Sequence, residues 1–180
     1  GQSTEPDTVV RAIHQHLVRA DQFREASAVQ ESLQNYFTAL RLAEESHHTQ
    51  LLALASLKIG SLYEQYYRYG ESIPYLKVAY AIILQTDSLE WQASVANSIA
   101  WNYIKTRQID SALVYSLQSV DRYRQINTPS VFNYCVALES LGEIRALKGQ
   151  YKESYGALAL CMQLARDSGN EIVVGFTHYG

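Results

Sequence analysis

The sequence predicts an all-α protein built from repeated pairs of helices, and three observations lead to this prediction. Only 3 prolines and 9 glycines occur among the 180 residues, too few for a many-turned β-sandwich or a disordered linker. The hydrophobic content of 47% and the charged content of 18% allow a sizeable core. A pattern of small and aromatic side chains also recurs along the chain at a nearly constant interval, which is typical of stacked helical units.

The repeat is centred on a small residue in each of four comparable segments: LVRADQF (17–23), LKIGSLY (57–63), NSIAWNY (97–103) and ESLGEIR (139–145). We call these small residues the anchors: Ala20, Gly60, Ala100 and Gly142. The intervals between them are 40, 40 and 42 residues. Such regularity predicts that the anchors occupy equivalent places in successive helix pairs.

Further columns of similar residues follow each anchor. Small residues stand twelve and nineteen positions past it, at Ser32, Ser72, Ala112 and Ser154, and at Ala39, Ala79, Ser119 and Cys161. Large apolar residues mostly stand at four further positions. Three past the anchor are Phe23, Tyr63 and Tyr103, and nine past it are Val29, Tyr69, Ile109 and Tyr151. Sixteen past it are Tyr36, Leu76 and Leu158, and twenty past it are Leu40, Tyr80, Val120 and Met162. Arg145 and Ser116 are the two residues that break the pattern.

The repeat divides the chain into helix pairs. We expect a single domain, 1–180, with approximate units at 8–46, 47–87, 88–127 and 128–168 and a partial unit at 169–180, hence eight helices and part of a ninth. Turn-forming residues occur near these boundaries, in QTDS (85–88), INTP (126–129) and DSGN (167–170).

Individual residues predict where some helices begin and end. Thr128 is a candidate N-cap with Pro129 at the first helical position, where a missing N–H is harmless. Gly149 is suited to a left-handed cap that closes the same helix. We expect Pro74 in the first turn of its helix, where it does not interrupt hydrogen bonding.

These columns resemble the tetratricopeptide repeat (TPR), a helix-turn-helix unit, and LGEIRALKGQYKESYGALALCMQLA (141–165) is the best match. The resemblance covers nearly the whole chain, although the usual unit has about 34 residues. In its longer period this chain resembles the repeats in sensor regions of bacterial two-component or helix-turn-helix regulators. Similar long-period repeats are found in peptide-binding quorum-sensing regulators and in the cargo-binding part of kinesin light chains. The resemblance implies a right-handed superhelix, an α-solenoid, with a concave channel.

One tyrosine-rich stretch, LYEQYYRYGESIPYL (62–76), allows two interpretations. Tyr63 and Tyr69 fall in columns of the repeat, so we interpret them as packing residues. Tyr66, Tyr67 and Tyr75 fall in no column; we expect them to contact a neighbouring unit, and the alternative is a role in binding a partner.

The resemblance also implies which residues face a partner, because the first helix of each TPR pair lines the concave face. Transferred by position, this predicts a mildly acidic groove lined by Asp21, Arg24, Ser61, Glu64, Gln65, Asn97, Trp101, Lys105, Glu139 and Glu143. An exposed aromatic residue in a groove is a typical hot spot, so Trp101 is the leading candidate, with packing between repeats as the alternative. A TPR clamp for carboxylate tails needs a lysine and an asparagine flanking the anchor, and no repeat has that pair.

Composition and motifs argue against several other functions. The net charge of −3 offers no basic stripe for nucleic acid, and the longest apolar-rich run, VAYAIIL (78–84), is too short for a membrane span. Glu139 and Glu143 could in principle form an acid–base pair, but we interpret them as solvated carboxylates. We predict no catalytic site, no cofactor and no metal site, and we interpret Cys135 and Cys161 as buried free thiols.

The sequence therefore predicts a non-catalytic scaffold that binds a protein or peptide in its groove, as the sensor or interaction region of a bacterial signal-transduction protein. The alternatives are a cytosolic adaptor, a peptide-sensing quorum-type regulator, or the recognition region of a larger enzyme. Because the chain opens GQSTEPD without an initiator methionine, we interpret it as a processed, exported chain and expect a periplasmic location, with a cytoplasmic one as the alternative. An apolar run near the end, EIVVGF (171–176), suggests homo-oligomers through the terminal repeat.

Overall fold

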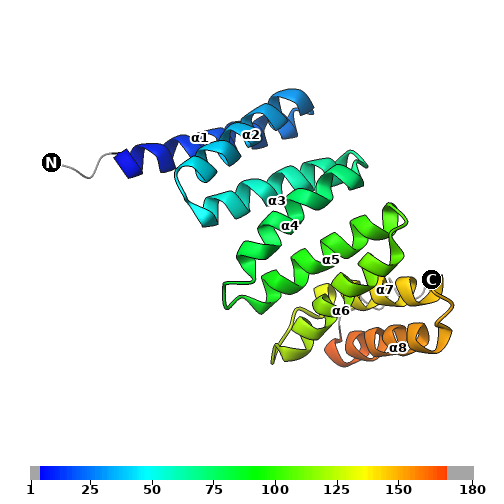
Figure 1. Cartoon of the computed structure of the whole chain (residues 1–180). Coiled ribbons are helices and arrows are strands. Elements are labelled where there is room, and N and C mark those ends of the chain that lie inside the picture. Colours follow the sequence, from blue (N-terminus) through cyan, green and yellow to red (C-terminus); the bar gives the residue numbers. More distant parts are fainter. Residues whose placement is uncertain (1–4, 170–180) are drawn as a thin grey trace. The chain divides into compact units, whose positions relative to one another are not determined.

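The computed structural model describes residues 5–169, and all regular structure in that range is α-helical. The chain divides into two compact units, Gly1–Gln85 and Thr86–Gly180. Each unit holds two pairs of helices, and the pairs follow one another along the sequence (Figure 1). The all-α prediction is confirmed, whereas the partial ninth helix lies outside the described residues.

The first unit contains the pair α1 (Glu5–Glu25) and α2 (Val29–Glu45) and the pair α3 (Thr49–Gln65) and α4 (Tyr69–Ile83). The two helices of each pair pack along their length, and α3 also packs against α2 and α1. Apolar side chains from α1, α2 and α3 form the core, among them Ile13, Leu17, Tyr36, Ile59 and Leu62. Since one pair alone would leave these side chains in water, stacking of the pairs completes the core.

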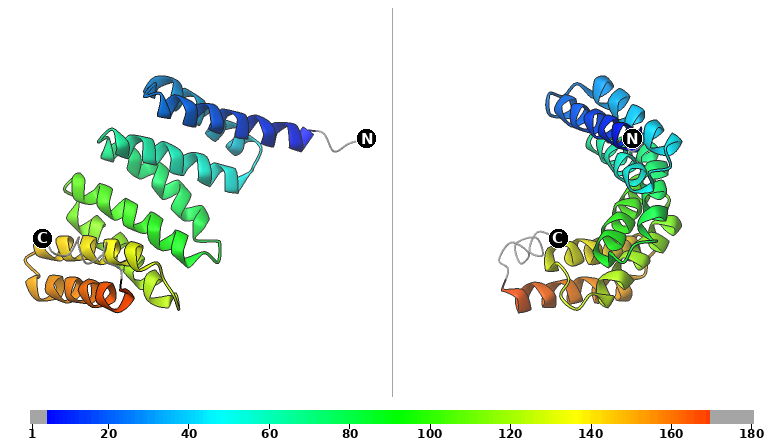
Figure 2. Two further views of the ribbon diagram at one scale, coloured as in Figure 1. Left: turned by 180° about the vertical axis from the view of Figure 1, so that it is seen from behind. Right: turned by 90° about the vertical axis from the view of Figure 1, so that its left-hand side faces the viewer.

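The second unit has the same plan, with α5 (Leu89–Lys105) paired with α6 (Ile109–Gln125), and α7 (Val131–Leu147) paired with α8 (Tyr151–Ser168). Here α7 packs against both α6 and α5. Figure 2 shows the pairs from two further sides. The core includes Val120, Tyr123, Leu138 and Cys161, and the rings of Tyr123 and Tyr134 stack with centroids 5.3 Å apart.

The anchors lie where the two helices of a pair meet. The Ser32 hydroxyl donates a hydrogen bond of 2.9 Å to the carbonyl oxygen of Ala20. The same bond joins Ser72 to Gly60 at 2.9 Å and Ser154 to Gly142 at 2.8 Å. The column twelve residues past the anchor is therefore small for two reasons: it allows close approach, and it satisfies a buried hydroxyl.

In the second and fourth repeats a glycine anchor leaves room for a leucine sixteen positions further on, whereas the first repeat combines Ala20 with Tyr36. A Cβ atom on Gly60 would lie 2.7 Å from Cδ2 of Leu76, and one on Gly142 would lie 3.0 Å from Cδ2 of Leu158. In the third repeat the anchor is Ala100, and Ser116 takes the place of the leucine. The smaller partner leaves room for the alanine methyl group, which gives a physical reason for the exception at Ser116.

A residue with a left-handed backbone follows six of the eight described helices. Gly169, with a φ of 62°, ends α8, and the other five are Ser27, His47, Tyr67, Arg107 and Gly149, with φ values of 58° to 72°. In each of these five turns, the residue after the left-handed one donates its backbone N–H to a carbonyl oxygen in the last turn of the helix. At Tyr67, for example, the N–H of Arg68 donates to the carbonyl oxygen of Tyr63 at 2.9 Å. This is the Schellman motif. Of these five turns, only the one at Gly149 was predicted, because the other four use residues with a side chain.

Two predictions about helix starts are wrong. The N-cap of α7 is Ser130, whose hydroxyl accepts a hydrogen bond from the backbone N–H of Asn133 at 3.3 Å, and not Thr128. Pro129 thus precedes the helix. Pro74 is the sixth residue of α4, beyond the first turn, because the turn at Tyr67 lets the helix begin at Tyr69.

Candidate partner-binding surface

The ten predicted partner-binding residues all lie on odd-numbered helices. On each helix, neighbouring members of the set are three or four residues apart, except for Glu64 and Gln65, which are adjacent. This spacing places them on one helical face. In the first unit α1 contacts α3, and in the second unit α5 contacts α7. The predicted residues therefore fall into two sets, one on α1 and α3 and one on α5 and α7.

In the first unit an arginine bridges the two odd-numbered helices. Arg24 on α1 donates one hydrogen bond to Oε1 of Gln65 at 2.6 Å and another to the hydroxyl of Ser61 at 3.1 Å, both on α3. All three residues are predicted groove residues, yet they bind one another. Their first role is to hold one repeat against the next.

A second bridge forms around Asp21, which accepts hydrogen bonds from Tyr36 and from Nζ of Lys58. Lys58 lies on α3, and its ion pair with Asp21 measures 2.8 Å. Burial, together with the hydrogen bond to the Asp21 carboxylate, raises the pKa of Tyr36 to about 12. We call the residues of both bridges, Asp21, Arg24, Lys58, Ser61 and Gln65, the α1–α3 seam.

Sequence analysis did not find two members of this arrangement. Tyr36 was assigned to packing, and its hydroxyl partner was not foreseen. Lys58 stands two residues before its anchor, a position for which the resemblance implies no role. The lysine and aspartate lie 37 residues apart, nearly one repeat, and that interval is the signal that could have identified the pair. The remaining predicted residue, Glu64, is half-buried on α3.

In the second unit the corresponding face has a different chemistry. The side chain of Trp101 on α5 is 37% exposed, and Nζ of Lys105 lies 3.8 Å from the centroid of its ring. This is a cation–π contact between residues one helical turn apart. Asn97, one turn before Trp101, is half-buried, and its Oδ1 atom accepts no hydrogen bond from any residue that the structure describes.

The predicted carboxylates lie on α7. Glu139 is half-buried, with Oε1 3.9 Å from the Sγ atom of Cys161, and burial raises its pKa. Glu143 is exposed one turn further along. Neither forms an ion pair within residues 5–169. We call Asn97, Trp101, Lys105, Glu139 and Glu143 the α5–α7 face.

The two cysteines lie behind this face, between α7 and α8. Both are buried and free, and the thiol of Cys135 contacts the carbonyl oxygen of Cys161 at 3.4 Å. Burial raises the pKa of both thiols. They therefore remain protonated at neutral pH, as suits packing residues.

The tyrosines of residues 62–76 serve mainly in packing. Tyr75 stacks on Tyr63 of its own repeat, with centroids 5.8 Å apart, and contacts Phe37 of the preceding repeat at 5.7 Å. The expected contact with a neighbouring unit is thus present for Tyr75. Tyr67 instead occupies a left-handed turn, is 80% exposed, and meets the ring edge of Tyr69 in its own repeat.

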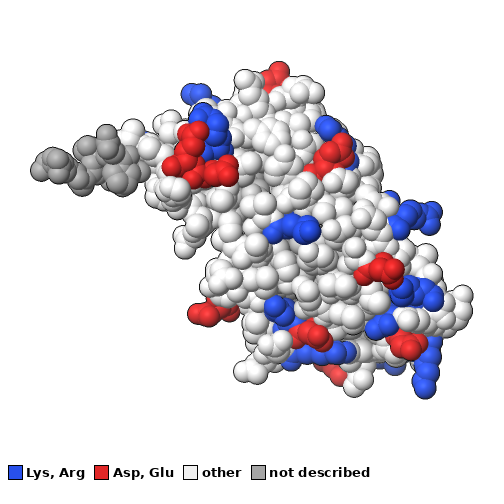
Figure 3. All heavy atoms as spheres, viewed as in Figure 1, with Lys and Arg blue, Asp and Glu red and all other residues white. Residues whose placement is uncertain are grey.

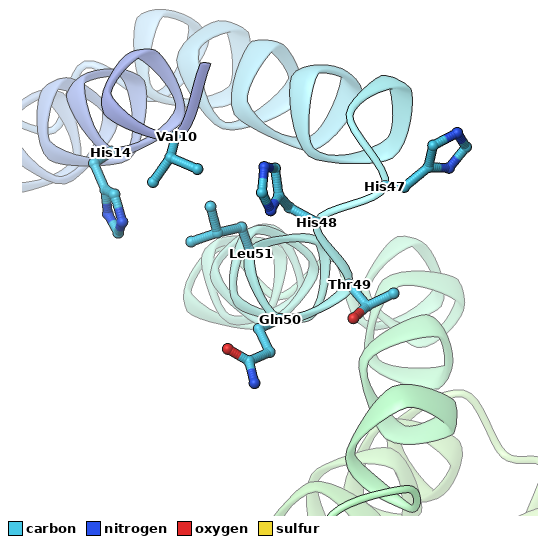
Figure 4. A pocket seen from close by; sticks show the side chains of 7 residues that line it. All are labelled: Val10, His14, His47, His48, Thr49, Gln50 and Leu51. Carbon is cyan, nitrogen blue, oxygen red and sulfur yellow. The ribbon is translucent and has the colours of Figure 1, made fainter. Parts of the chain in front are cut away.

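A cavity of about 380 Å³ opens between α1 and the start of α3 in the first unit. His14 and His48 line it, and Figure 4 shows His48 directed toward Val10 and Leu51, while the side chain of His47 points away. Among the described residues, no group of three or more His, Cys, Asp or Glu side chains is arranged to hold a metal ion.

Charges on the molecular surface are mixed in sign. On the face that Figure 3 shows, basic and acidic side chains lie interspersed, and short-range ion pairs such as Arg68–Glu71 and Arg124–Asp121 are common on the helices. Within residues 5–169, no helix combines the length and the apolar character needed to cross a membrane.

Comparison with solved structures identifies the fold. The chain superposes on BtubC (BKLC) from P. vanneervenii with a TM-score of 0.81 and 13% identity, covering 94% of this chain and 68% of that one. For RapI in its apo form the TM-score is 0.82 at 9% identity, covering 94% of this chain and 46% of RapI. Nearly identical TPR-like repeats from Podosopora anserina match with a TM-score of 0.71 and 16% identity, over 88% of this chain and 76% of theirs.

These likenesses define the class of protein: the chain has a TPR-like fold, an α-solenoid of helix pairs. The resemblance that the repeated columns indicate is thereby confirmed. Neither a protein-family profile nor a curated protein matches the sequence.

Proposed function

We propose that this chain is a non-catalytic scaffold that binds a protein or peptide through its odd-numbered helices, with the α5–α7 face as the contact surface. One observation carries the proposal: Trp101 is exposed on α5, and α5 contacts α7, on which Glu139 and Glu143 are without an ion pair among the described residues. Exposed tryptophan side chains are among the residues most often found as binding hot spots.

The α1–α3 seam supports this choice by contrast. Arg24, Asp21, Ser61 and Gln65 already bind one another or Lys58, so a partner would have to break these bonds to use them. Within residues 5–169, the α5–α7 face has only the contact between Lys105 and Trp101 and the weak thiol contact of Glu139. Binding there costs fewer internal interactions.

Selection of peptides from a random display library tests the proposal. Peptides selected on the wild-type chain should lose at least about thirtyfold in affinity when Trp101→Ala is introduced. Trp91→Ala is the matched control, because Trp91 is also exposed on α5 but is not part of the α5–α7 face; it should change affinity less than twofold. Peptides that bind Trp101→Ala as tightly as the wild type would place the contact surface elsewhere.

We further propose that the scaffold is the sensor or interaction region of a bacterial signal-transduction protein located in the periplasm. The long-period repeat supports the sensor role. The gene sequence surrounding this segment distinguishes it from the alternatives. A signal peptide before this segment, and a membrane span with a kinase-like or DNA-binding module after it, would support the sensor. A neighbouring catalytic domain would support the recognition region of an enzyme. If the gene encodes neither arrangement, the adaptor is supported.

We also propose that the terminal repeat binds a second copy of the chain. Tyr155 on α8 is 76% exposed, whereas Leu33, at the same position of the first repeat, is buried. Tyr155 also lines a cavity of about 420 Å³ with Met162 and Arg166. Analytical ultracentrifugation should show concentration-dependent dimers that Tyr155→Ser weakens; a monomer at every concentration would contradict the proposal.

A further inference from the structure

The α1–α3 seam and the α5–α7 face are built from equivalent positions of the repeat, and the comparison shows what the second lacks. In the first unit the position four past the anchor is Arg24, which donates to the side chains one and five past the next anchor. In the second unit that position is Ile104, which is buried and cannot donate. The guanidinium group of the first unit thus has no counterpart in the second.

The residues that would receive this guanidinium differ as well. Ser61, a neutral hydroxyl in the first unit, corresponds to the carboxylate of Glu143 in the second. One turn earlier on the same helix lies Glu139, half-buried. A half-buried carboxylate without an ion pair is costly, and Glu139 together with the exposed carboxylate of Glu143 favours a cation supplied from outside.

Trp101 shows that a cation fits against this face. The ammonium of Lys105 lies 3.8 Å from the ring centroid, close to the best distance for a cation–π contact. Trp101 stands one residue past its anchor, the position that Asp21 has in the first unit. Asp21 binds the ammonium of Lys58, which stands two residues before the next anchor. In the second unit the residue equivalent to Lys58 is Ser140, which follows Glu139 in the sequence. By this equivalence the side of α5 that bears Trp101 faces α7, the helix that bears Glu139.

We propose that the α5–α7 face recognises an arginine-containing basic peptide, whose guanidinium stacks on Trp101 and is hydrogen-bonded by Glu139 and Glu143. Arginine fits better than lysine, because its planar group can stack on the indole and donate to carboxylates at the same time. The peptide guanidinium takes the role that Arg24 has within the first unit. This inference rests on the proposed function and adds the chemical class of the ligand.

The experiment uses three peptides of equal length that carry Arg-Arg, Glu-Glu or Leu-Leu at the centre of a Gly-Ser sequence, each labelled with fluorescein. Titration by fluorescence anisotropy should show binding of the Arg-Arg peptide only. In a Trp91→Phe background, in which Trp101 is the single tryptophan of the chain, the same peptide without the label should change the indole fluorescence.

Substitutions identify the groups responsible. Glu139→Gln and Glu143→Gln should each lower the affinity for the Arg-Arg peptide about tenfold, as expected for the loss of one charge-assisted hydrogen bond. Glu153→Gln, on α8 of the same repeat and exposed, is the matched control and should change affinity less than twofold. Lys105→Met removes the internal cation from the indole and should tighten binding about twofold to fivefold.

The outcomes separate this inference from the proposed function. If display selects peptides that need Trp101 but have no excess of arginine, the inference is wrong and the proposed function stands. If the Arg-Arg peptide fails to bind, or binds the Glu139→Gln/Glu143→Gln variant as tightly as the wild type, the inference is also overturned. Circular dichroism of each variant excludes misfolding as the cause of a loss.

Discussion

The hydroxyl of Ser72 donates a hydrogen bond of 2.9 Å to the carbonyl oxygen of Gly60, where α3 and α4 meet. The equivalent bond occurs in the first and fourth repeats, and the third repeat has Ala112 in place of the serine. This bond ties the two helices of a pair together at the point where their backbones approach most closely. The pairs that have it and the pair that lacks it provide a natural comparison.

Ser72→Ala should lower the free energy of unfolding by about 1 kcal/mol, because it removes a buried hydrogen bond. Urea denaturation followed by circular dichroism measures the change. The reverse substitution, Ala112→Ser, should create the same bond to Ala100 and leave the chain at least as stable as the wild type. Equal stability of Ser72→Ala and wild type would contradict a stabilising role for the hydroxyl.

Gly60→Ala should lower the free energy of unfolding by about 1 kcal/mol, since its Cβ would lie 2.7 Å from Cδ2 of Leu76. Gly156→Ala is the matched control: it also lies within a helix, but a Cβ there meets no atom within 4 Å. In this control the free energy of unfolding should rise by about 0.5–1 kcal/mol, because alanine is favoured over glycine within a helix. Combining Gly60→Ala with Leu76→Ala should reveal a coupling of about 1 kcal/mol, and strict additivity would exclude the clash.

Arg107→Gly should raise the free energy of unfolding by about 0.5–1 kcal/mol, because Arg107 has a φ of 63° that favours glycine. The opposite change, Gly149→Ala at a φ of 72°, should lower it by about 1 kcal/mol. Thermal unfolding of the two variants should therefore shift Tm in opposite directions. A decrease of Tm for Arg107→Gly would mean that its side chain makes contacts that outweigh the backbone strain.

Tyr36→Phe should lower the free energy of unfolding at neutral pH by about 1.5 kcal/mol, because the hydroxyl donates to the Asp21 carboxylate. The pKa of Tyr36 is raised from 10.0 to about 12, so the folded chain favours the neutral phenol. Its contribution is complete below pH 10 and is lost as the pH rises toward 12. Between these values the wild type should lose stability more steeply than Tyr36→Phe, and parallel curves would contradict the shift.

Periodicity was sufficient to predict the fold. The anchors and the small column twelve residues later reflect close helix contacts, and such contacts restrict residue size wherever they recur. The left-handed turns at Ser27, Tyr67 and Arg107 could not be predicted in the same way, because their backbone conformation is imposed by packing of the helices on either side. Local propensity indicated the left-handed turn at Gly149 and a turn within residues 167–170.

The helices that carry the candidate residues were predicted, but the bonds among these residues were not. The resemblance placed Arg24 and Ser61 on the odd-numbered helices, where they lie. That they bind each other depends on the stacking of successive pairs, which no single segment encodes. Sequence likewise gave no means to distinguish the α1–α3 seam, in which charges are paired, from the α5–α7 face, in which two carboxylates are not.

The α1–α3 seam and the apolar cores also respond differently to added salt. Screening weakens the pair between Lys58 and Asp21, whose side chains are 30% and 38% exposed. It has little effect on the stacked rings of Tyr123 and Tyr134, and sulfate strengthens such apolar contacts. Ionic strength is thus a control by which the α1–α3 seam loosens while the apolar cores of both units are kept.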